Sequence, residues 1–398
     1  MFLIVFVDVL GFTIVIPLLG LYAERFGASP LTATLIVSCY AACSLISTPI
    51  IGRLSDQYGR RRLLLLSQAG TCAGFVLLGY SSALWMVFVG RILDGLTAGN
   101  LSIAQAYISD HTEPENRAKS FGVIGIAFGF GFMFGPALGG WLGQKGLHLP
   151  FLVAAGLSAL SMVCTYVLLP KVEPPRLLAE GAPAGPGGRR PGAFEFETYA
   201  TYFRRPELRS LYAQFFLFSF AFSLFVSGFA LFAERRFIHD GLPWTAREVG
   251  YLFAYSGVLG ILWQGGLIGR LVKKYGEVSL TLAGFATSVV GYVVLGFVPD
   301  DQLLPLGLIT VVSSFGHGVL RPVLTSRITR AVGRHEQGVA IGISGSLSSV
   351  AMMMAPPTGG FLLGEHQLLA WVLVPAAVSL LGVVLALASR PAAAPPTA

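Results

Sequence analysis

Apolar stretches of membrane-spanning length recur along the whole chain, and this pattern constrains the fold more than any other feature. Hydrophobic residues make up 54% of the 398 residues and charged residues only 12%, whereas a soluble domain carries about 25% charged residues. Because so few charges cannot cover a water-facing surface of normal size, lipid must be the solvent for much of the chain. A signal peptide would give one short apolar run at the start, so the repetition indicates an integral membrane protein.

A spanning helix needs about 20 mostly apolar residues, and this criterion predicts an all-α membrane protein with twelve transmembrane helices in two six-helix bundles. The predicted spans are 2–23, 33–52, 63–82, 84–107, 119–142, 149–169, 211–233, 248–269, 278–298, 303–325, 338–361 and 368–389. A polar, Gly- and Pro-rich stretch after the sixth span has the composition of a flexible linker. We therefore expect an N-terminal bundle at 1–170, a cytoplasmic linker at 171–209 and a C-terminal bundle at 210–398. Alternatively, the last part of the linker, 194–209, lies along the membrane surface as a short helix.

An even number of spans places both termini on one side, and the basic residues indicate which side. If the termini are inside, the inner loops and tail hold twenty Lys and Arg residues and the outer loops hold five. Positive charge is retained on the cytoplasmic side, so we expect both termini in the cytoplasm. Arg235 and Arg236, in one outer loop, are a local exception. Arg outnumbers Lys 22 to 5, which favours a bacterial origin and hence the inner membrane.

The sequence argues against several other classes of protein. The net charge of +7 arises from short loops, so we predict no nucleic-acid partner. The four cysteines lie in apolar runs without metal-ligand spacing, so we predict no metal site. No nucleophile with an adjacent base and no phosphate-binding loop stands in a polar setting, so we expect no enzyme, no catalytic residue and no cofactor.

Two sequence echoes relate the halves of the chain. Ile-Gly-Arg-Leu at 51–54 recurs at 268–271, and each copy is followed at the same spacing by Tyr-Gly, ending at Gly59 and Gly276. The Gly-Pro and Gly-Gly pairs of 135–140 are echoed at 355–360. We infer duplication of a six-helix unit, and such parallel halves suit alternating access about a central site.

The segment 52–61, Gly-Arg-Leu-Ser-Asp-Gln-Tyr-Gly-Arg-Arg, resembles the loop signature of the major facilitator superfamily. The Gly-rich fifth span is similar to the signature of its twelve-span drug:proton antiporters, which include the tetracycline exporters. The resemblance covers essentially the whole chain and implies proton-coupled efflux by alternating access. Tetracycline exporters carry a further acid in the third span, whereas 63–82 contains none, which argues against tetracycline itself as the substrate.

The resemblance assigns two groups of residues. It implies that Gly52, Asp56, Gly59, Arg60 and Arg61 form a lock that holds the two halves in one state, whereas a basic inner loop that serves topology alone is the alternative. In the second copy Lys273 stands in the place of Asp56 and Glu277 in the place of Arg60, so its charges are inverted. The antiporter helix residues are Gly131, Gly135, Pro136, Gly139 and Gly140. We expect them to serve close packing or bending rather than ligand binding.

Ionisable residues inside the spans are the sharper indication of function, because a charge at mid-membrane costs at least about 2.5–3.5 kcal/mol. Arg91 and Asp94 are three residues apart on the fourth span, and the resemblance places Asp8 on a neighbouring span. We predict that Arg91 pairs with the two acids in turn and so forms a proton-coupling switch. A permanent ion pair that only holds the two spans together is the alternative, and Asp8 is also close enough to the start of its span to reach the membrane surface.

The second half supplies the candidates for the substrate cavity, which are Gln214, Trp263, Gln264, His317, Arg321 and Met353. Aromatic and methionine side chains adapt to varied apolar shapes. His317 is alternatively a hydrogen-bonded packing residue, and Arg321 has no acidic partner in the second-half spans. The leading hypothesis is export of amphipathic, drug-like molecules by a monomer whose partners are the substrate, protons and the lipid bilayer. The alternative is uptake or facilitated transport of a polar metabolite such as a sugar or an organic anion.

Overall fold

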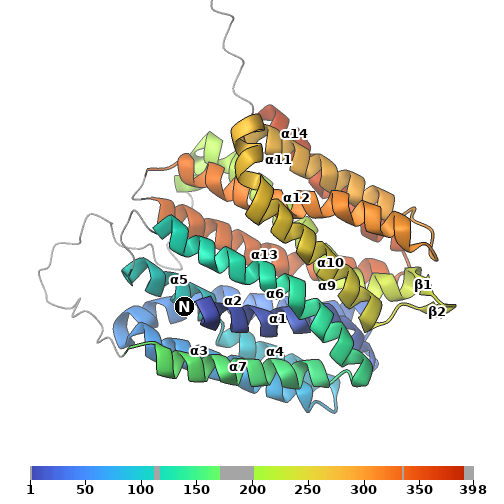
Figure 1. The fold of residues 1–398 in the computed structure, drawn as a ribbon, viewed down its shortest axis with the longest axis horizontal. Helices are drawn as coiled ribbons and strands as arrows, with labels where there is room; N and C mark the ends of the chain where they lie inside the picture. The colour runs from blue at the N-terminus through green and yellow to red at the C-terminus, as the bar shows by residue number, and fades with distance from the viewer. Residues whose placement is uncertain (1, 112–116, 171–200, 334–335, 390–398) are drawn as a thin grey trace, which may run out of the picture.

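Long helices in two groups make up nearly all of the described chain (Figure 1). A computed structural model describes residues 2–111, 117–170, 201–333 and 336–389, so most of the predicted linker, 171–200, lies outside them. The first group consists of α1 (Phe2–Glu24), α2 (Pro30–Tyr58), α3 (Arg60–Gly79), α4 (Leu84–Leu96), α5 (Asn100–His111), α6 (Arg117–Lys145) and α7 (Leu149–Leu168). The second consists of α9 (Pro206–Arg236), β1 (Ile238–His239), β2 (Leu242–Pro243), α10 (Ala246–Ile261), the π-helix η1 (Leu262–Leu267), α11 (Ile268–Leu295), α12 (Leu303–Arg330), α13 (Gln337–Gly364) and α14 (Leu368–Ala388).

These helices form an all-α membrane fold and are compatible with twelve spans. Ten stretches of the described residues are long and apolar enough to cross a membrane, and one of them, Ala246–Leu295, contains two predicted spans. This stretch turns at Gly276, whose φ of 76° and ψ of 160° interrupt α11. The predicted fourth span is interrupted between α4 and α5. With α11 divided at Gly276 and α4 and α5 taken as one interrupted span, each half supplies six.

The two glycines of the Tyr-Gly echo share an unusual backbone conformation. Gly59 separates α2 from α3 at φ 94° and ψ 136°, close to the values of Gly276. A residue with a Cβ is strained at such positive φ values. The repeated sequence therefore produces the same turn in both halves, as the inferred duplication predicts.

The halves meet closely at one end of the molecule and part toward the other. The antiparallel pair β1–β2 marks the first end, called the hairpin end, and the turn from α2 into α3 marks the opposite, Gly59 end (Figure 1). Across the interface α6 packs on α10, α2 on α13 and α1 on α9. The largest apolar core contains Leu19 and Ala33 of the first half together with Phe229 and Trp371 of the second. The clusters nearer the Gly59 end each stay within one half.

Glycine contacts show the same asymmetry. At the hairpin end a Cβ on Gly360 would lie 2.7 Å from the carbonyl oxygen of Pro30, and a Cβ on Gly140 would lie 2.6 Å from that of Ala246. Such distances mean that the backbones of the two halves touch there. A Cβ on Gly52 or Gly342, nearer the Gly59 end, would meet nothing within 4 Å. The structure is therefore closed at the hairpin end and open at the Gly59 end.

Candidate functional site

A buried ion pair lies on α4, where Arg91 and Asp94 share one helix face as their spacing predicts. Nη1 of Arg91 donates to Oδ2 of Asp94 at 2.6 Å, and the two side chains are 1% and 5% exposed. The guanidinium lies 4.1 Å from the ring centroid of Tyr40 in α2. Removing two charges from water is costly unless they are paired and hydrogen-bonded, so each residue of the pair makes the burial of the other tolerable.

Asp8 of α1 lies beside this pair but bonds to a different residue. Nε2 of Gln68 in α3 lies 3.4 Å from Oδ2 of Asp8 and donates at 2.8 Å to Oγ of Ser161 in α7. Asp94 is close enough for its charge to repel that of Asp8. Within the described part of the chain no ion pair joins Asp8 to Arg91, which serves Asp94 in this conformation. The alternation of Arg91 between the two acids stays a prediction.

The sequence analysis missed Gln68 and Tyr40, which complete the polar cluster. Gln68 is fully buried, and neither its Oε1 nor Nε of Arg91 has a hydrogen-bond partner. An unpaired buried polar atom costs about 1–3 kcal/mol, so these two atoms mark a region that is held under strain beside the acids. The amide of Gln68 within an apolar span is the signal that identifies it, because polar groups in membrane spans are expensive.

The interruption between α4 and α5 begins directly after the ion pair, and its backbone groups are satisfied from other helices. Ser47 donates to the carbonyl of Gly95 at 2.6 Å, Thr48 donates to that of Ala98 at 2.9 Å, and the amide of Gly99 donates to Oγ of Ser67 at 3.0 Å. Non-helical backbone is tolerated at membrane depth only where it is buried in protein or lines a water-filled cavity. Hydroxyl groups of α2 and α3 therefore fix a break in the span that carries Asp94.

The charges of the loop signature are engaged at the Gly59 end of the first half. Asp56 and Arg60 form an ion pair, and Nη1 of Arg60 donates to Oγ of Ser55 at 2.6 Å. Nη2 of Arg61 donates to the carbonyl of Tyr166 in α7 at 2.5 Å. These contacts tie α2, α3 and α7 together within one half. Gly52, the first residue of the signature, faces open space.

The second copy of the signature carries its charges differently, as its sequence predicts. Oγ of Ser326 donates to Oε1 of Glu277 at 2.7 Å, and Arg330 lies 3.5 Å from the same oxygen. Glu277 thus connects α11 to α12 within the second half.

The glycines of α6 form two packing faces. Gly131, Gly135 and Gly139 lie on one face against α1, and Thr13 of α1 donates to the carbonyl of Gly131 at 2.8 Å. Gly140 lies against α10 of the other half, where a Cβ on Gly250 would lie 2.5 Å from the carbonyl of Pro136. The residues of the predicted antiporter helix therefore make backbone contacts with both halves, as expected for packing.

The structure separates the predicted cavity residues into two sets. Trp263 and Gln264 lie on η1, with Gln264 exposed, and Met353 is half-buried on α13. Gln214 does not join them, because its side chain is fully buried and bonds to Ser210 and Ser389. The presence of a polar residue in a span therefore did not identify a cavity residue here. The amide of Gln214 bonds to residues inside the second half instead.

His317 and Arg321, one turn apart on α12, have different environments. Nε2 of His317 lies 2.9 Å from the hydroxyl of Tyr292, and its ring contacts Phe222 and Phe225. This environment suits the packing alternative. The side chain of Arg321 is exposed, and its guanidinium has no hydrogen-bond or ion-pair partner among the residues that the structure describes.

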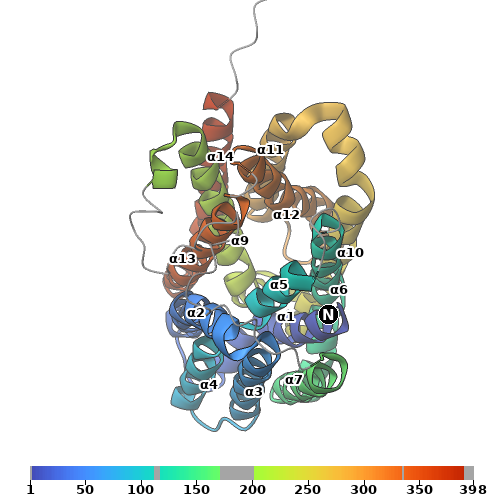
Figure 2. The same ribbon diagram turned by 90° about the vertical axis from the view of Figure 1, so that its left-hand side faces the viewer.

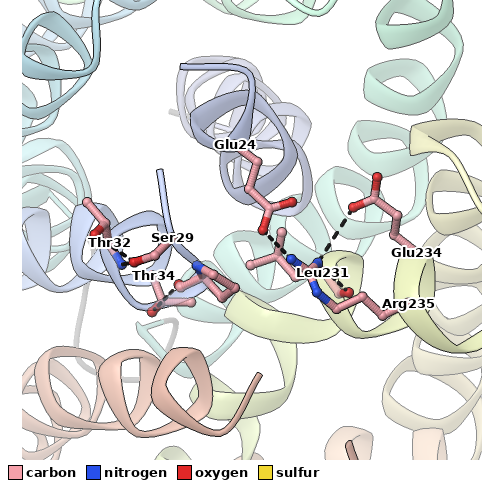
Figure 3. A network of polar contacts seen from close by, with 8 residues as sticks. Glu24, Ser29, Thr32, Thr34, Leu231, Glu234 and Arg235 are labelled. Carbon is pink, nitrogen blue, oxygen red and sulfur yellow. Dashed lines mark hydrogen bonds and ion pairs between the residues drawn. The ribbon is translucent and has the colours of Figure 1, made fainter. Parts of the chain in front are cut away.

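The two halves are also joined by charge at the hairpin end (Figure 3). Arg235 of α9 donates from Nη2 to Oε1 of Glu24 of α1 at 2.5 Å, and Glu234 lies 3.7 Å from its other nitrogen. Arg236 donates to the carbonyl of Val298 at 2.8 Å. Each of these two arginines is thus held by a partner at the hairpin end.

No group of three His, Cys, Asp or Glu side chains that could hold a metal ion occurs among the described residues. The fold and the buried charges define a membrane protein of two repeated halves that join at one end. The family model of the Major Facilitator Superfamily matches residues 1–309 and 238–398. The chain belongs to the Major Facilitator Superfamily.

Relatives and solved structures agree with this assignment. Tetracycline resistance protein, class C, of Escherichia coli is 29% identical over 356 residues, covering 88% of this chain and 85% of that protein. Multidrug resistance protein 1 of Bacillus subtilis is 27% identical over 361 residues, covering 90% and 87%. The crystal structure of the nucleoside transporter NupG superimposes with a TM-score of 0.74 at 13% identity, covering 97% of this chain and 96% of that one. That of the human organic anion transporter TETRAN gives 0.72 at 22% identity, covering 97% of each.

Proposed function

We propose that this protein is a secondary active transporter that exports amphipathic, drug-like molecules in exchange for protons by alternating access. The observation that carries the proposal is the buried cluster of Asp8, Arg91 and Asp94, which places two acids and one cation inside one bundle. Buried ionisable groups in membrane spans commonly belong to proton relays. The names of the relatives, which concern tetracycline and multidrug resistance, support efflux.

The proposed switch uses Arg91 as a shared cation. In the described conformation Arg91 neutralises Asp94, while the hydrogen-bonding partners of Asp8, Gln68 and Ser161, are neutral. A proton that enters the cluster neutralises one acid and leaves Arg91 to pair with the other. Packed halves switch between two discrete conformations rather than deforming continuously. A change in which acid Arg91 pairs with can therefore shift the equilibrium between those two conformations of the transporter.

The proposed transporter is a monomer in the plasma membrane, with its termini and the Gly59 end facing the cytoplasm. The N-terminal bundle, 1–170, carries coupling, and the C-terminal bundle, 210–398, carries more of the substrate selectivity. In this arrangement the described conformation is open to the cytoplasm. The signature residues Asp56, Arg60 and Arg61 would bridge the halves in the opposite state, as the family resemblance implies.

The test is transport by the purified protein in liposomes, with ethidium as substrate and a pH-sensitive dye to follow protons. We expect ethidium export to depend on the pH gradient in the wild type and to lose that dependence in Asp8→Asn and Asp94→Asn. Asp301→Asn, in an exposed loop, is the matched control and keeps it. A wild-type rate that does not change with the gradient contradicts the proposal.

The same assay addresses the alternative, uptake or facilitated transport of a polar metabolite. Gradient-independent accumulation of a sugar or an organic anion, without ethidium export, would favour that function. If Asp8→Asn and Asp94→Asn both retain the proton coupling of the wild type, the ion pair of Arg91 and Asp94 has only a structural role.

A further inference from the structure

Arg91 and Arg321 are the arginines that lie inside the predicted spans. Arg91 is paired with Asp94, and nearer the helix ends Arg235 is paired with Glu24 and Arg327 donates to Thr281 at 3.1 Å. Arg321 has an exposed side chain and no partner among the described residues. It lies nine residues before the end of α12, or about 14 Å along the helix axis. Arg321 lies inside the predicted span 303–325, and a charged residue within a span pairs with another polar group or faces a water-filled cavity.

Two neighbours on α12 indicate the direction of the Arg321 side chain. One turn earlier, His317 packs on Phe222 of α9, with ring centroids 5.2 Å apart. Gly318 packs on Trp263 of η1, where a Cβ would meet the Trp263 side chain at 3.3 Å. Arg321 projects between these two directions.

Arg321 therefore lies between α9 and the helix formed by α10 and η1, and both α9 and α10 are among the three second-half helices that pack on the first half. α9 packs on α1 and α10 packs on α6, whereas α9 and α10 have few contacts with each other. Figure 2, viewed from the Gly59 end, shows α12 between α9 and α10. The Arg321 side chain on α12 is exposed.

The residues beside Arg321 suit an aromatic group. Nε1 of Trp263 donates to Oγ of Ser314 at 3.2 Å, and its ring meets that of Phe315 edge-on at 5.1 Å. These contacts hold the indole in a fixed orientation beside Ser314 and Phe315, about two turns of α12 before Arg321. The adjacent Gln264 is exposed and offers an amide.

Acids that could neutralise Arg321 are engaged elsewhere in this conformation. Glu277 is bonded to Ser326 and Arg330, and Glu336 is bonded to Arg205. Asp94 pairs with Arg91, and Asp8 bonds to Gln68, inside the first bundle. Among the described residues, an arriving anion therefore meets no fixed competitor at Arg321.

We propose that Arg321 binds the anionic group of an amphipathic substrate, a carboxylate or a sulfonate, while Trp263 contacts its aromatic ring. The inference rests on the proposed export function and adds to it the charge of a substrate class. Guanidinium binds an oxyanion such as a carboxylate through two parallel hydrogen bonds, an arrangement that lysine does not reproduce.

The test compares an anionic and a cationic dye, carboxyfluorescein and ethidium, in liposomes that contain the wild type, Arg321→Gln, Arg321→Lys or Arg330→Gln. Arg330→Gln removes an exposed charge from the same helix and is the matched control. We expect Arg321→Gln to raise the KM for carboxyfluorescein about ten- to a hundredfold, the loss of one charged hydrogen bond. Arg321→Lys has an intermediate effect, and Arg330→Gln leaves the KM for carboxyfluorescein unchanged.

Fluorescence polarisation of carboxyfluorescein with the detergent-purified variants gives a second readout that does not depend on turnover. An unchanged affinity in Arg321→Gln overturns the inference. So does a wild type that exports ethidium but does not bind carboxyfluorescein, although the proposed function then stands. Failure to export either dye contradicts the proposed function itself and removes the basis of the inference.

Discussion

Glu24 at the end of α1 and Arg235 in the last turn of α9 form a 2.5 Å ion pair that joins the two halves at the hairpin end. Both side chains are about a fifth to a quarter exposed, at 21% and 24%. Glu234 lies 3.7 Å from the same guanidinium and is an alternative partner within α9. The pair exists only while the hairpin end is closed, so it favours the described conformation over one that opens there.

Glu24→Gln should increase the fraction of molecules that open at the hairpin end. A partly exposed pair contributes up to about 1 kcal/mol, so we expect a two- to fivefold increase. The measurement is the labelling rate, by a membrane-impermeant maleimide, of Ala23→Cys, a position buried at this end. Glu234→Gln, which leaves the pair intact, is the control. Equal labelling rates with and without Glu24→Gln would contradict the prediction.

Arg91→Met should destabilise the protein by about 3–5 kcal/mol, because it leaves the Asp94 carboxylate buried without a counter-charge. The double variant Arg91→Met, Asp94→Asn should recover much of the loss, since no charge then remains. Thermal unfolding in detergent measures both. A double variant no more stable than Arg91→Met would mean that the two residues do not depend on each other.

Gly135→Ala should weaken the packing of α6 on α1 by about 1–3 kcal/mol. A Cβ at this position overlaps Oγ1 of Thr13, whose hydrogen bond to Gly131 leaves it little freedom to move. Gly156→Ala in α7, where a Cβ meets nothing within 4 Å, is the matched control. Thermal stability and yield of folded protein should fall only for the former, and equal losses would refute the packing argument.

The ion pair of Arg205 and Glu336, outside the spans, should stabilise the second half in a pH-dependent way. Both guanidinium nitrogens donate to the carboxylate, at 2.8 and 3.0 Å, and this holds the pKa of Glu336 below its ordinary value of 4.5. A lowered folded-state pKa gives stability that is present above the unfolded value and is lost as the pH falls through the folded one. Wild type should therefore unfold at a slightly higher temperature than Glu336→Gln at neutral pH. The difference should shrink as the pH falls below 4.5, and one that persists there would contradict the assignment.

Apolar length and the repeated Tyr-Gly predicted most of the fold. The boundary predicted between 269 and 278 coincides with the turn at Gly276 in α11. The Tyr-Gly pair marks this turn in the sequence, because glycine adopts a positive φ without strain. The break inside the predicted span 84–107 was not foreseen. It depends on Ser47, Thr48 and Ser67 reaching from other helices, and such tertiary partners leave no local pattern.

The candidate site was predicted unevenly for a similar reason. Helical spacing alone places Arg91 against Asp94. The choice of Gln68 rather than Arg91 as the neighbour of Asp8 depends on how α1, α3 and α7 pack, and hydropathy carries no information about that. Gln214 was predicted to line the substrate cavity, but its side chain bonds within the second bundle. The sequence alone does not distinguish these two roles for a polar residue in a span.

The two glycine faces of α6 also restrict how this protein can change in length. Gly131, Gly135 and Gly139 serve α1, while Gly140 serves α10, so both contacts are set by one helical register. Inserting or deleting one residue between 131 and 140 would rotate everything beyond it by about 100°. Neither contact could then be kept without losing the other. Viable variants of this segment should therefore differ by substitution and not by length.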